Sequence, residues 1–216
     1  YTPGPIDLAS PEAVDITLTA FPYCTGMNNA QSTVQLFFQD EVTVYAGDDD
    51  YFCATGTYSL DEANATNFEN LMWSSSGDEY FSNPEVLNPN YYPGNNDISG
   101  GYVQLTLTGF SINPCTTTVV DDLGLSLTAS PEAYAGPNTS ICETQNHPIQ
   151  NASAQHYSSI LWETSGDGTY SNPEIQNPVY YPGQIDIATG TAALTLNVTG
   201  NDPCNFIVSD EQTLYI

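Results

Sequence analysis

One short stretch that occurs twice decides the fold of this chain. The first copy is Leu71-Met72-Trp73-Ser74-Ser75-Ser76-Gly77-Asp78, and the second is Ile160-Leu161-Trp162-Glu163-Thr164-Ser165-Gly166-Asp167. Each copy begins with apolar residues typical of a buried strand and ends in a Ser-Gly-Asp turn. The copies lie 89 residues apart. We therefore expect tandem units, each with a central strand that carries a tryptophan.

The repeat extends over the whole sequence. Residues 45–127 and 134–216 align without a gap, and 32 of the 83 aligned positions are identical. Residues 1–38 match the second half of a unit, so we predict a truncated repeat there, two complete repeats after it, and junctions at 39–44 and 128–133. The missing half comes either from upstream residues, which we favour, or from another chain. A period of this size is typical of arrays that act as spacers or adhesive stalks.

Within a unit the pattern is all-β. Residues 103–108 alternate apolar and polar side chains, as a half-buried strand should. Residues 206–216 have the pattern of a closing strand, and residues 93–98 that of a turn with at most one helical turn. About seven short strands around one tryptophan predict an immunoglobulin-like β-sandwich, with Trp73 and Trp162 in its core.

The charge of the chain is one-sided. It contains 26 Asp and Glu but no Lys or Arg, which gives a formal net charge of −26. Such a chain repels phosphate backbones and anionic lipid, so nucleic-acid binding is excluded as a function class. No stretch approaches 18 apolar residues, so we expect no membrane span in this window. Trypsin-like proteases have no cleavage site here, which suits an exposed, extracellular stalk.

Five cysteines follow the repeat. The two cysteines of each complete unit lie 62 residues apart, which predicts disulfides Cys53–Cys115 and Cys142–Cys204, with Cys24 bound to an upstream partner. A rival pairing joins Cys24 to Cys53 and Cys115 to Cys142. Either pairing suits an oxidising, extracellular compartment. No Cys-x-x-Cys occurs, so zinc is not expected.

Acidic residues offer one candidate metal site. Calcium takes six to eight oxygen ligands, which clustered carboxylates can supply. The best local cluster lies around the first junction, and its members are Asp40, Glu41, Asp48, Asp49 and Asp50. The alternative is that these are solvated turn carboxylates. Other acidic residues recur in both units: Asp78/Asp167, Glu85/Glu174, Asp97/Asp186 and Asp121/Asp210.

Two tyrosine pairs are candidate ligand contacts. In a strand, one residue of Tyr91-Tyr92 and one of Tyr180-Tyr181 points outward. We expect the outward residues to be Tyr92 and Tyr181, where an exposed ring can stack on a sugar or pack on a neighbouring domain. No Ser/His/Asp set recurs and no phosphate loop is present, so we predict no catalytic residues and no enzyme.

Several of these motifs together resemble a known family. They are the runs Tyr134–Cys142, Ser158–Tyr170, Tyr181–Gly183 and Asn201–Cys204, with Asn177-Pro178 and Leu194–Leu196. The chain resembles the immunoglobulin/PKD-like repeats of giant surface proteins of Bacteroidetes, which include SprB-like gliding-motility adhesins exported by the type IX system. The resemblance implies secretion, cell-surface display and adhesion.

The sequence thus predicts a non-enzymatic repeat segment of a long, secreted, surface adhesin or filament. Its partners would be neighbouring repeats and an external surface or polysaccharide, and it needs no cofactor apart from the calcium considered above. Two alternatives stay open. The units are carbohydrate-binding accessory modules of a secreted enzyme, or the chain is a polymerising fibre subunit completed by another chain.

Overall fold

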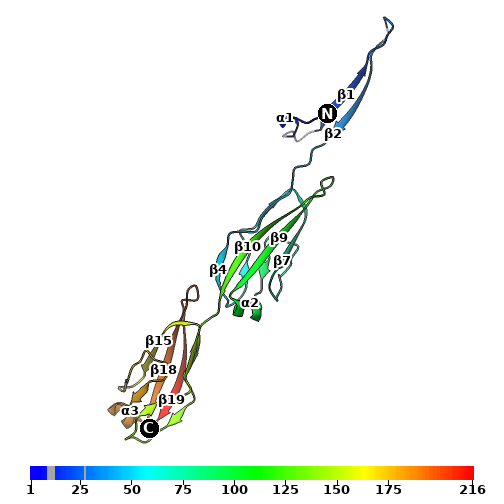
Figure 1. The fold of residues 1–216 in the computed structure, drawn as a ribbon. Coiled ribbons are helices and arrows are strands. Elements are labelled where there is room, and N and C mark those ends of the chain that lie inside the picture. The colour runs from blue at the N-terminus through cyan, green and yellow to red at the C-terminus, as the bar shows by residue number, and fades with distance from the viewer. Residues whose placement is uncertain (9–12, 27) are drawn as a thin grey trace.

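The computed structural model describes residues 1–8, 13–26 and 28–216. An N-terminal segment is followed by two β-sandwiches that lie end to end (Figure 1). The segment contains the short helix α1 (Pro5–Leu8) and strands β1 (Val14–Ala20) and β2 (Ala30–Leu36). The two strands form an antiparallel hairpin from Val14↔Leu36 to Ala20↔Ala30.

The first sandwich contains eight strands and one short helix. These are β3 (Thr43–Tyr45), β4 (Asp50–Cys53), β5 (Tyr58–Ser59), β6 (Asn64–Thr66), β7 (Phe68–Ser75), β8 (Asn90–Tyr91), α2 (Asn95–Gly100), β9 (Tyr102–Ser111) and β10 (Thr118–Thr128). One layer is the four-stranded sheet β4-β10-β9-β7, in which β4 pairs in parallel with β10. The pairs β3–β6 and β5–β8 complete the unit.

The second sandwich repeats this plan with nine strands and one short helix. These are β11 (Glu132–Tyr134), β12 (Thr139–Ser140), β13 (His147–Pro148), β14 (Ser153–Gln155), β15 (Tyr157–Thr164), β16 (Thr169–Tyr170), β17 (Val179–Tyr181), α3 (Gln184–Thr189), β18 (Thr191–Gly200) and β19 (Ile207–Tyr215). Its four-stranded sheet has the order β12-β19-β18-β15, and β13-β17-β16 and β11-β14 form the smaller sheets.

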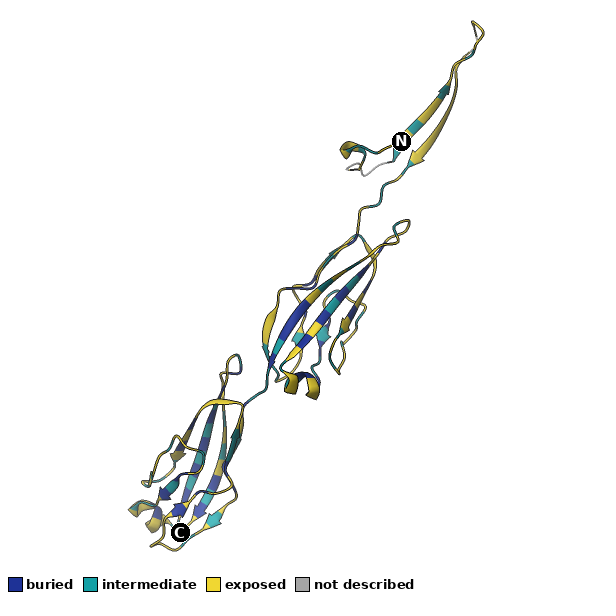
Figure 2. Cartoon of the chain, viewed as in Figure 1, coloured by how far each residue is buried: buried dark blue, intermediate teal, exposed yellow. Residues whose placement is uncertain are grey.

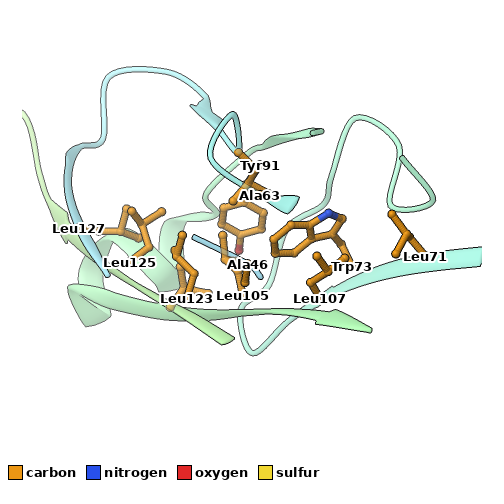
Figure 3. Close-up of a cluster of buried hydrophobic side chains, with 12 residues drawn as sticks. Ala46, Ala63, Leu71, Trp73, Tyr91, Leu105, Leu107, Leu123, Leu125 and Leu127 are labelled. Carbon is orange, nitrogen blue, oxygen red and sulfur yellow. The ribbon is translucent and has the colours of Figure 1, made fainter. Parts of the chain in front are cut away.

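Each sandwich has its own core, which the alternation along its long strands produces. In β9, Val103, Leu105 and Leu107 are fully buried while the residues between them face outward. Figure 2 shows the same alternation in both units. Trp73 and Trp162 are each 2% exposed, and Figure 3 shows Trp73 beside Leu105, Leu107 and the ring of Tyr91.

A buried tyrosine–aspartate pair fixes the helical turn of each unit. The Tyr91 hydroxyl donates to Asp97 at 2.6 Å, and the Tyr180 hydroxyl donates to Asp186 at 2.6 Å. Each aspartate also accepts the backbone N–H of the glycine that directly precedes its helix, at 3.0 Å. A Cβ added at Gly77 or at its counterpart Gly166 would collide with the aspartate carboxylate. This close approach explains why glycine occupies the Ser-Gly-Asp turn in both copies.

The structure confirms the all-β, tandem immunoglobulin-like sandwich, but it shifts the unit boundaries. Strand β3 begins at Thr43 and β11 at Glu132, so the ends of both predicted junctions belong to the sandwiches. Val42, which directly precedes β3, is only 2% exposed and therefore also belongs to the first sandwich. Among the described helices, none has the length and apolar character needed to cross a bilayer.

Candidate functional site

The candidate site is the junction between the two sandwiches. The first sandwich ends where β10 reaches Thr128, and Cys53 at the end of β4 lies opposite it in the parallel register. The N–H of Ala54 donates to the Thr128 carbonyl at 2.9 Å and closes this end of the sheet. Cys53 therefore faces the next unit.

A disulfide crosses the junction. It joins Cys53 of the first unit to Cys204, which lies between β18 and β19 of the second, with a Cα–Cα distance of 5.0 Å and a sequence separation of 151. Cys24, Cys115 and Cys142 are free in this structure. Both pairings expected from the sequence are therefore wrong, the one within units and the rival one between units.

Strand geometry explains why the predicted pairs cannot form. Cys53 lies opposite Thr128 at one end of β10, whereas Cys115 lies just before Thr118, the first residue of β10. Eleven strand residues span ten steps of about 3.4 Å each, which places these cysteines roughly 35 Å apart. A disulfide needs Cα atoms within about 7 Å. The two cysteines of one unit therefore lie at opposite ends and point to different neighbours.

Polar contacts support the disulfide. The Cys204 sulfur lies 3.3 Å from the Thr128 carbonyl oxygen, and the Thr128 hydroxyl donates to the Asp202 carbonyl at 3.4 Å. A His156 ring nitrogen lies 3.1 Å from the Ser130 carbonyl oxygen. A cavity of about 490 Å³ also spans the junction, and it is lined by Asn95, Ile98, Ser99, Leu127, Thr128, Ala129, His156 and Asn201. The connection between the units is thus short, bonded and covalently closed.

Most of the recurring acidic residues have structural partners. Asp121 and Asp210 accept the N–H of Ala46 and Ala135 at 2.8 and 2.7 Å. The Asp78 carboxylate accepts from the Asn96 side chain at 2.7 Å, and the Asp167 carboxylate accepts the N–H of Ile185 at 3.0 Å. Asp97 and Asp186 bind the buried tyrosines. Acid–base chemistry is not needed to explain why these six residues recur.

The structure does not gather the five predicted metal ligands. Asp49 accepts the N–H of Gly124 at 2.7 Å, and Asp50 accepts the Tyr58 hydroxyl at 3.0 Å. Asp48 accepts the Tyr45 hydroxyl, which raises the pKa of Tyr45 to about 12. Asp40 and Glu41 are exposed on the connecting segment. In the part of the chain that the structure describes, no three His, Cys, Asp or Glu residues form a possible metal site.

The tyrosine pairs split as expected, because Tyr91 and Tyr180 are fully buried. Their partners differ between the units. Tyr92 stacks on Tyr80 with the ring centroids 4.8 Å apart, whereas Tyr181 is 40% exposed. Tyr92 is therefore partly covered by its own unit, and Tyr181 presents more of its ring to solvent.

A surface groove recurs in both units, and no sequence motif predicts it. In the first unit it has a volume of about 370 Å³ and is lined by Phe68, Glu69, Asn70, Leu71, Met72, Glu85 and Phe110. In the second it has about 500 Å³ and is lined by Tyr157, Ser158, Ser159, Ile160, Leu161 and Glu174. An aromatic residue and a recurring glutamate lie at equivalent places in both grooves. In the sequence, these residues recur 89 positions apart, as Phe68 and Tyr157 and as Glu85 and Glu174.

No family model matches the chain, and no curated protein matches it. Solved structures with a similar fold include the protocadherin GammaB4 extracellular domain, at 12% identity and a TM-score of 0.41, covering 95% of this chain and 39% of that one. Human CDH23 EC21-23 gives 11% identity, a TM-score of 0.49, and coverage of 86% and 68%. Drosophila N-cadherin EC1-4 is 10% identical with a TM-score of 0.48, and the match covers 86% of this chain and 52% of that one. The chain thus spans about two fifths of the protocadherin GammaB4 structure and half of the N-cadherin one. These values are too low to assign the chain to a family.

Proposed function

We propose that this chain is a non-enzymatic segment of an extracellular stalk whose repeats are held together covalently. The observation that carries the proposal is the Cys53–Cys204 disulfide, because it joins two separate sandwiches rather than closing one. Structural disulfides persist in oxidising, extracellular compartments. A bond of this kind suits a load-bearing array.

The bond also determines which part of the chain carries tension. A force along the chain would reach Cys53 and pass through the disulfide to Cys204, so the residues between them would be shielded. The absence of Lys and Arg removes every trypsin-type cleavage site, including those that unfolding would expose. Both properties favour a stalk that is stretched and exposed to proteases.

Single-molecule stretching of the chain from its two ends would test this function. With the disulfide intact, we expect no length to be released from the residues between Cys53 and Cys204. With a reductant present, their separation of 151 residues should release about 500 Å of extra contour at roughly 3.4 Å per residue. The variant Cys204→Ser should release this length without a reductant. Release of the full length by the oxidised protein would contradict the load-bearing role.

Within this role, we propose that the stalk belongs to a secreted, surface-displayed adhesin or filament of the kind that gliding Bacteroidetes export through the type IX system. The support is the sequence resemblance together with the end-to-end sandwiches. On intact cells, antibodies against the segment should bind without permeabilisation, and deletion of the segment should reduce attachment to glass. Labelling only after permeabilisation would contradict surface display.

Carbohydrate binding is the second candidate function, and the recurring groove favours it. An aromatic ring beside a carboxylate is a common way to hold a sugar, since the ring stacks on the sugar and the carboxylate accepts from its hydroxyls. Titration with soluble polysaccharides should then show saturable binding that Tyr157→Ala and Phe68→Ala weaken. Binding that is lost instead in Tyr92→Ala and Tyr181→Ala would assign it to the outward tyrosines. No saturable binding would leave the stalk function alone.

Calcium binding at Asp40, Glu41, Asp48, Asp49 and Asp50 stays a prediction. If calcium binds the folded protein, the melting temperature should rise with the concentration of calcium and fall on chelation. The third function, a fibre subunit completed by another chain, depends on what covers the N-terminal hairpin.

A further inference from the structure

We propose that Cys115 and Cys142 form the same interunit disulfide with further repeats, so that every unit is joined covalently to both neighbours. This inference rests on the proposed stalk function and specifies how the array is joined. Two observations support it. Each of these free cysteines has a bonded counterpart 89 residues away, and the apolar face of the N-terminal hairpin is exposed where the same face is buried in a complete unit.

Cys142 occupies the place in the second unit that Cys53 occupies in the first. In the first unit β4 pairs in parallel with β10 from Asp50↔Leu125 to Cys53↔Thr128. In the second unit β12 pairs with β19 in the same register, as Thr139↔Leu214 and Ser140↔Tyr215. The N–H of Ile141 continues this pairing by donating to the Tyr215 carbonyl at 2.9 Å, and Cys142, the next residue, is exposed. Its thiol therefore lies at the far end of the second sandwich, where the hairpin of a next unit would meet it.

Cys115 occupies the place in the first unit that Cys204 occupies in the second. Its sulfur lies 3.8 Å from the Gln39 carbonyl oxygen, just as the Cys204 sulfur lies 3.3 Å from the Thr128 carbonyl oxygen. Gln39 and Thr128 are themselves 89 residues apart. The hairpin of the first unit is thus already packed against the chain that precedes it, in the arrangement that carries the disulfide at the next junction. Only the partner cysteine is missing.

The N-terminal hairpin shows where that cysteine belongs. Leu18 is 74% exposed and Val34 is 55% exposed, whereas their counterparts Leu107 and Leu123 are 0% and 2% exposed in the complete unit. An apolar face that is core in one copy lies open in the other. Residues 125–128 of β10 pair with β4, and their counterparts here are residues 36–39, at and just beyond the end of β2. Within the described part of the chain, no strand pairs with residues 36–39 in the way that β4 pairs with β10.

Residues 1–8 repeat the helical turn of a complete unit. Asp7 accepts from the Tyr1 hydroxyl and from the N–H of Gly4, as Asp97 accepts from Tyr91 and Gly94. Tyr1 is nevertheless 69% exposed, whereas Tyr91 is 0% exposed. The segment therefore has the local structure of a second half-unit, with no first half over it in this structure.

One occupant satisfies all of these openings. It is a first half-unit of the kind formed by residues 42–90, which include the buried Val42 and strand β3, located upstream in the same polypeptide. Its counterpart of β4 would pair with residues 36–39, which follow the end of β2, and the cysteine at its end would fall opposite Gln39, beside Cys115. Its other strands would cover Leu18, Val34 and Tyr1. A second copy of this chain has no spare first half-unit, because both of its first halves already belong to complete sandwiches.

Disulfide formation at Cys115 breaks two S–H bonds and forms one S–S bond. The two thiols lose two protons and two electrons by thiol–disulfide exchange, and a disulfide oxidant such as oxidised glutathione accepts them and becomes two thiols. The same balance holds at Cys142.

The test supplies the missing half. The full chain is extended by a copy of residues 42–90, which contains all of strand β3, placed directly before Tyr1, and it is refolded with reduced and oxidised glutathione. After alkylation of free thiols, non-reducing peptide mapping with an Asp/Glu-specific protease should find Cys115 joined to the added copy of Cys53. Cys53–Cys204 should persist, and Cys24 and Cys142 should be alkylated. An alkylated Cys115, or the added cysteine joined to Cys24, would overturn the proposal.

A second variant separates bonding from folding. In it, the added cysteine is replaced by serine, and hydrogen exchange is followed at Leu18 and Val34. If the amides of these two residues exchange slowly in this variant but rapidly in the unextended chain, the half-unit is the occupant even without the bond. Rapid exchange in both proteins would overturn the proposal. Disulfide-linked dimers of the unextended chain through Cys115 and Cys142 would assign the face to another copy instead. Failure of these tests leaves the stretching result of the unextended chain untouched, so the two proposals can fail separately.

Discussion

At the scale of single residues, the buried Tyr180–Asp186 pair links the core to the helical turn. Burial, together with the hydrogen bond to Asp186, raises the pKa of Tyr180 to about 12. The hydroxyl also shares a hydrogen bond of 2.8 Å with Thr164. Tyr180 is therefore protonated at every pH at which the protein would work, and its hydroxyl is a permanent donor to the carboxylate.

We expect Tyr180→Phe to destabilise the second unit by about 1.5–3 kcal/mol, because a buried carboxylate loses a donor while the ring still packs. Urea unfolding of the second unit, followed by Trp162 fluorescence, would measure the change. The control is Tyr215→Phe, since Tyr215 is 48% exposed and should change the free energy of unfolding little. Equal effects of the two variants would show that the pair adds nothing.

His147 gives the second unit a pH dependence that the first unit lacks, since its counterpart there is Tyr58. His147 is 6% exposed, and its burial lowers its pKa below the ordinary value of 6.5. The unfolded chain then binds a proton more readily than the folded unit does. Stability from this residue is full above pH 6.5 and is lost as the pH falls toward the lowered pKa.

We expect His147→Gln to reduce the loss of unfolding free energy of the second unit between pH 7.5 and pH 5.5. Urea unfolding of both proteins at the two pH values would measure it. The matched control is His156→Gln, in which the wild-type pH dependence should persist. A wild-type slope in His147→Gln as well would show that other groups cause it.

At the scale of elements, one side chain in each unit binds the backbone of the last long strand. It does so just before the short strand, β4 or β12, that pairs in parallel with β10 or β19. Asp49 accepts the N–H of Gly124 at 2.7 Å, and Asn138 accepts the N–H of Thr213 at 2.8 Å. Aspartate and asparagine present the same oxygen at this place. The acidic run of the first unit is therefore explained in part by a bond that needs no charge.

We expect Asp49→Asn to change the unfolding free energy of the first unit by less than about 0.5 kcal/mol, whereas Asp49→Ala should cost about 1 kcal/mol. Urea unfolding followed by Trp73 fluorescence would show the difference. If Asp49 were a calcium ligand, Asp49→Asn would also weaken the response of the melting temperature to calcium. Such a result would contradict a purely structural role.

At the scale of the whole molecule, the interunit disulfide limits how the two sandwiches move. In the chain-entropy model, closing a separation of 151 residues contributes about 5 kcal/mol against unfolding of both units. Each sandwich also has its own hydrophobic core. Loss of the bond should therefore loosen the junction without unfolding either unit.

We expect Cys204→Ser to retain the near-ultraviolet circular dichroism of both units and to broaden the interdomain distance distribution in small-angle X-ray scattering. The control is Cys142→Ser, which removes a thiol that is free in this chain and should leave the distribution unchanged. If Cys204→Ser unfolds the second unit, or if its scattering matches that of the wild type, the disulfide does not act on the junction.

The sequence by itself determined the repeat, the all-β class and the interior. The period of 89 residues placed Trp73 and Trp162 at equivalent core positions, and the alternation in residues 103–108 defined the buried face of β9. These features could be predicted because they depend on local spacing, which the pleat of a strand converts directly into an inward and an outward face.

Only the tertiary structure decided the bonding. Cysteine spacing suggested a disulfide within each unit, but the strands carry the two cysteines to opposite ends of the sheet. The clustered acids of residues 48–50 bind separate donors of their own unit, and the groove beside Glu85 and Glu174 forms where the start of a strand meets a turn that follows it. Each of these features depends on which strand ends meet in space, and spacing along the chain does not contain that information.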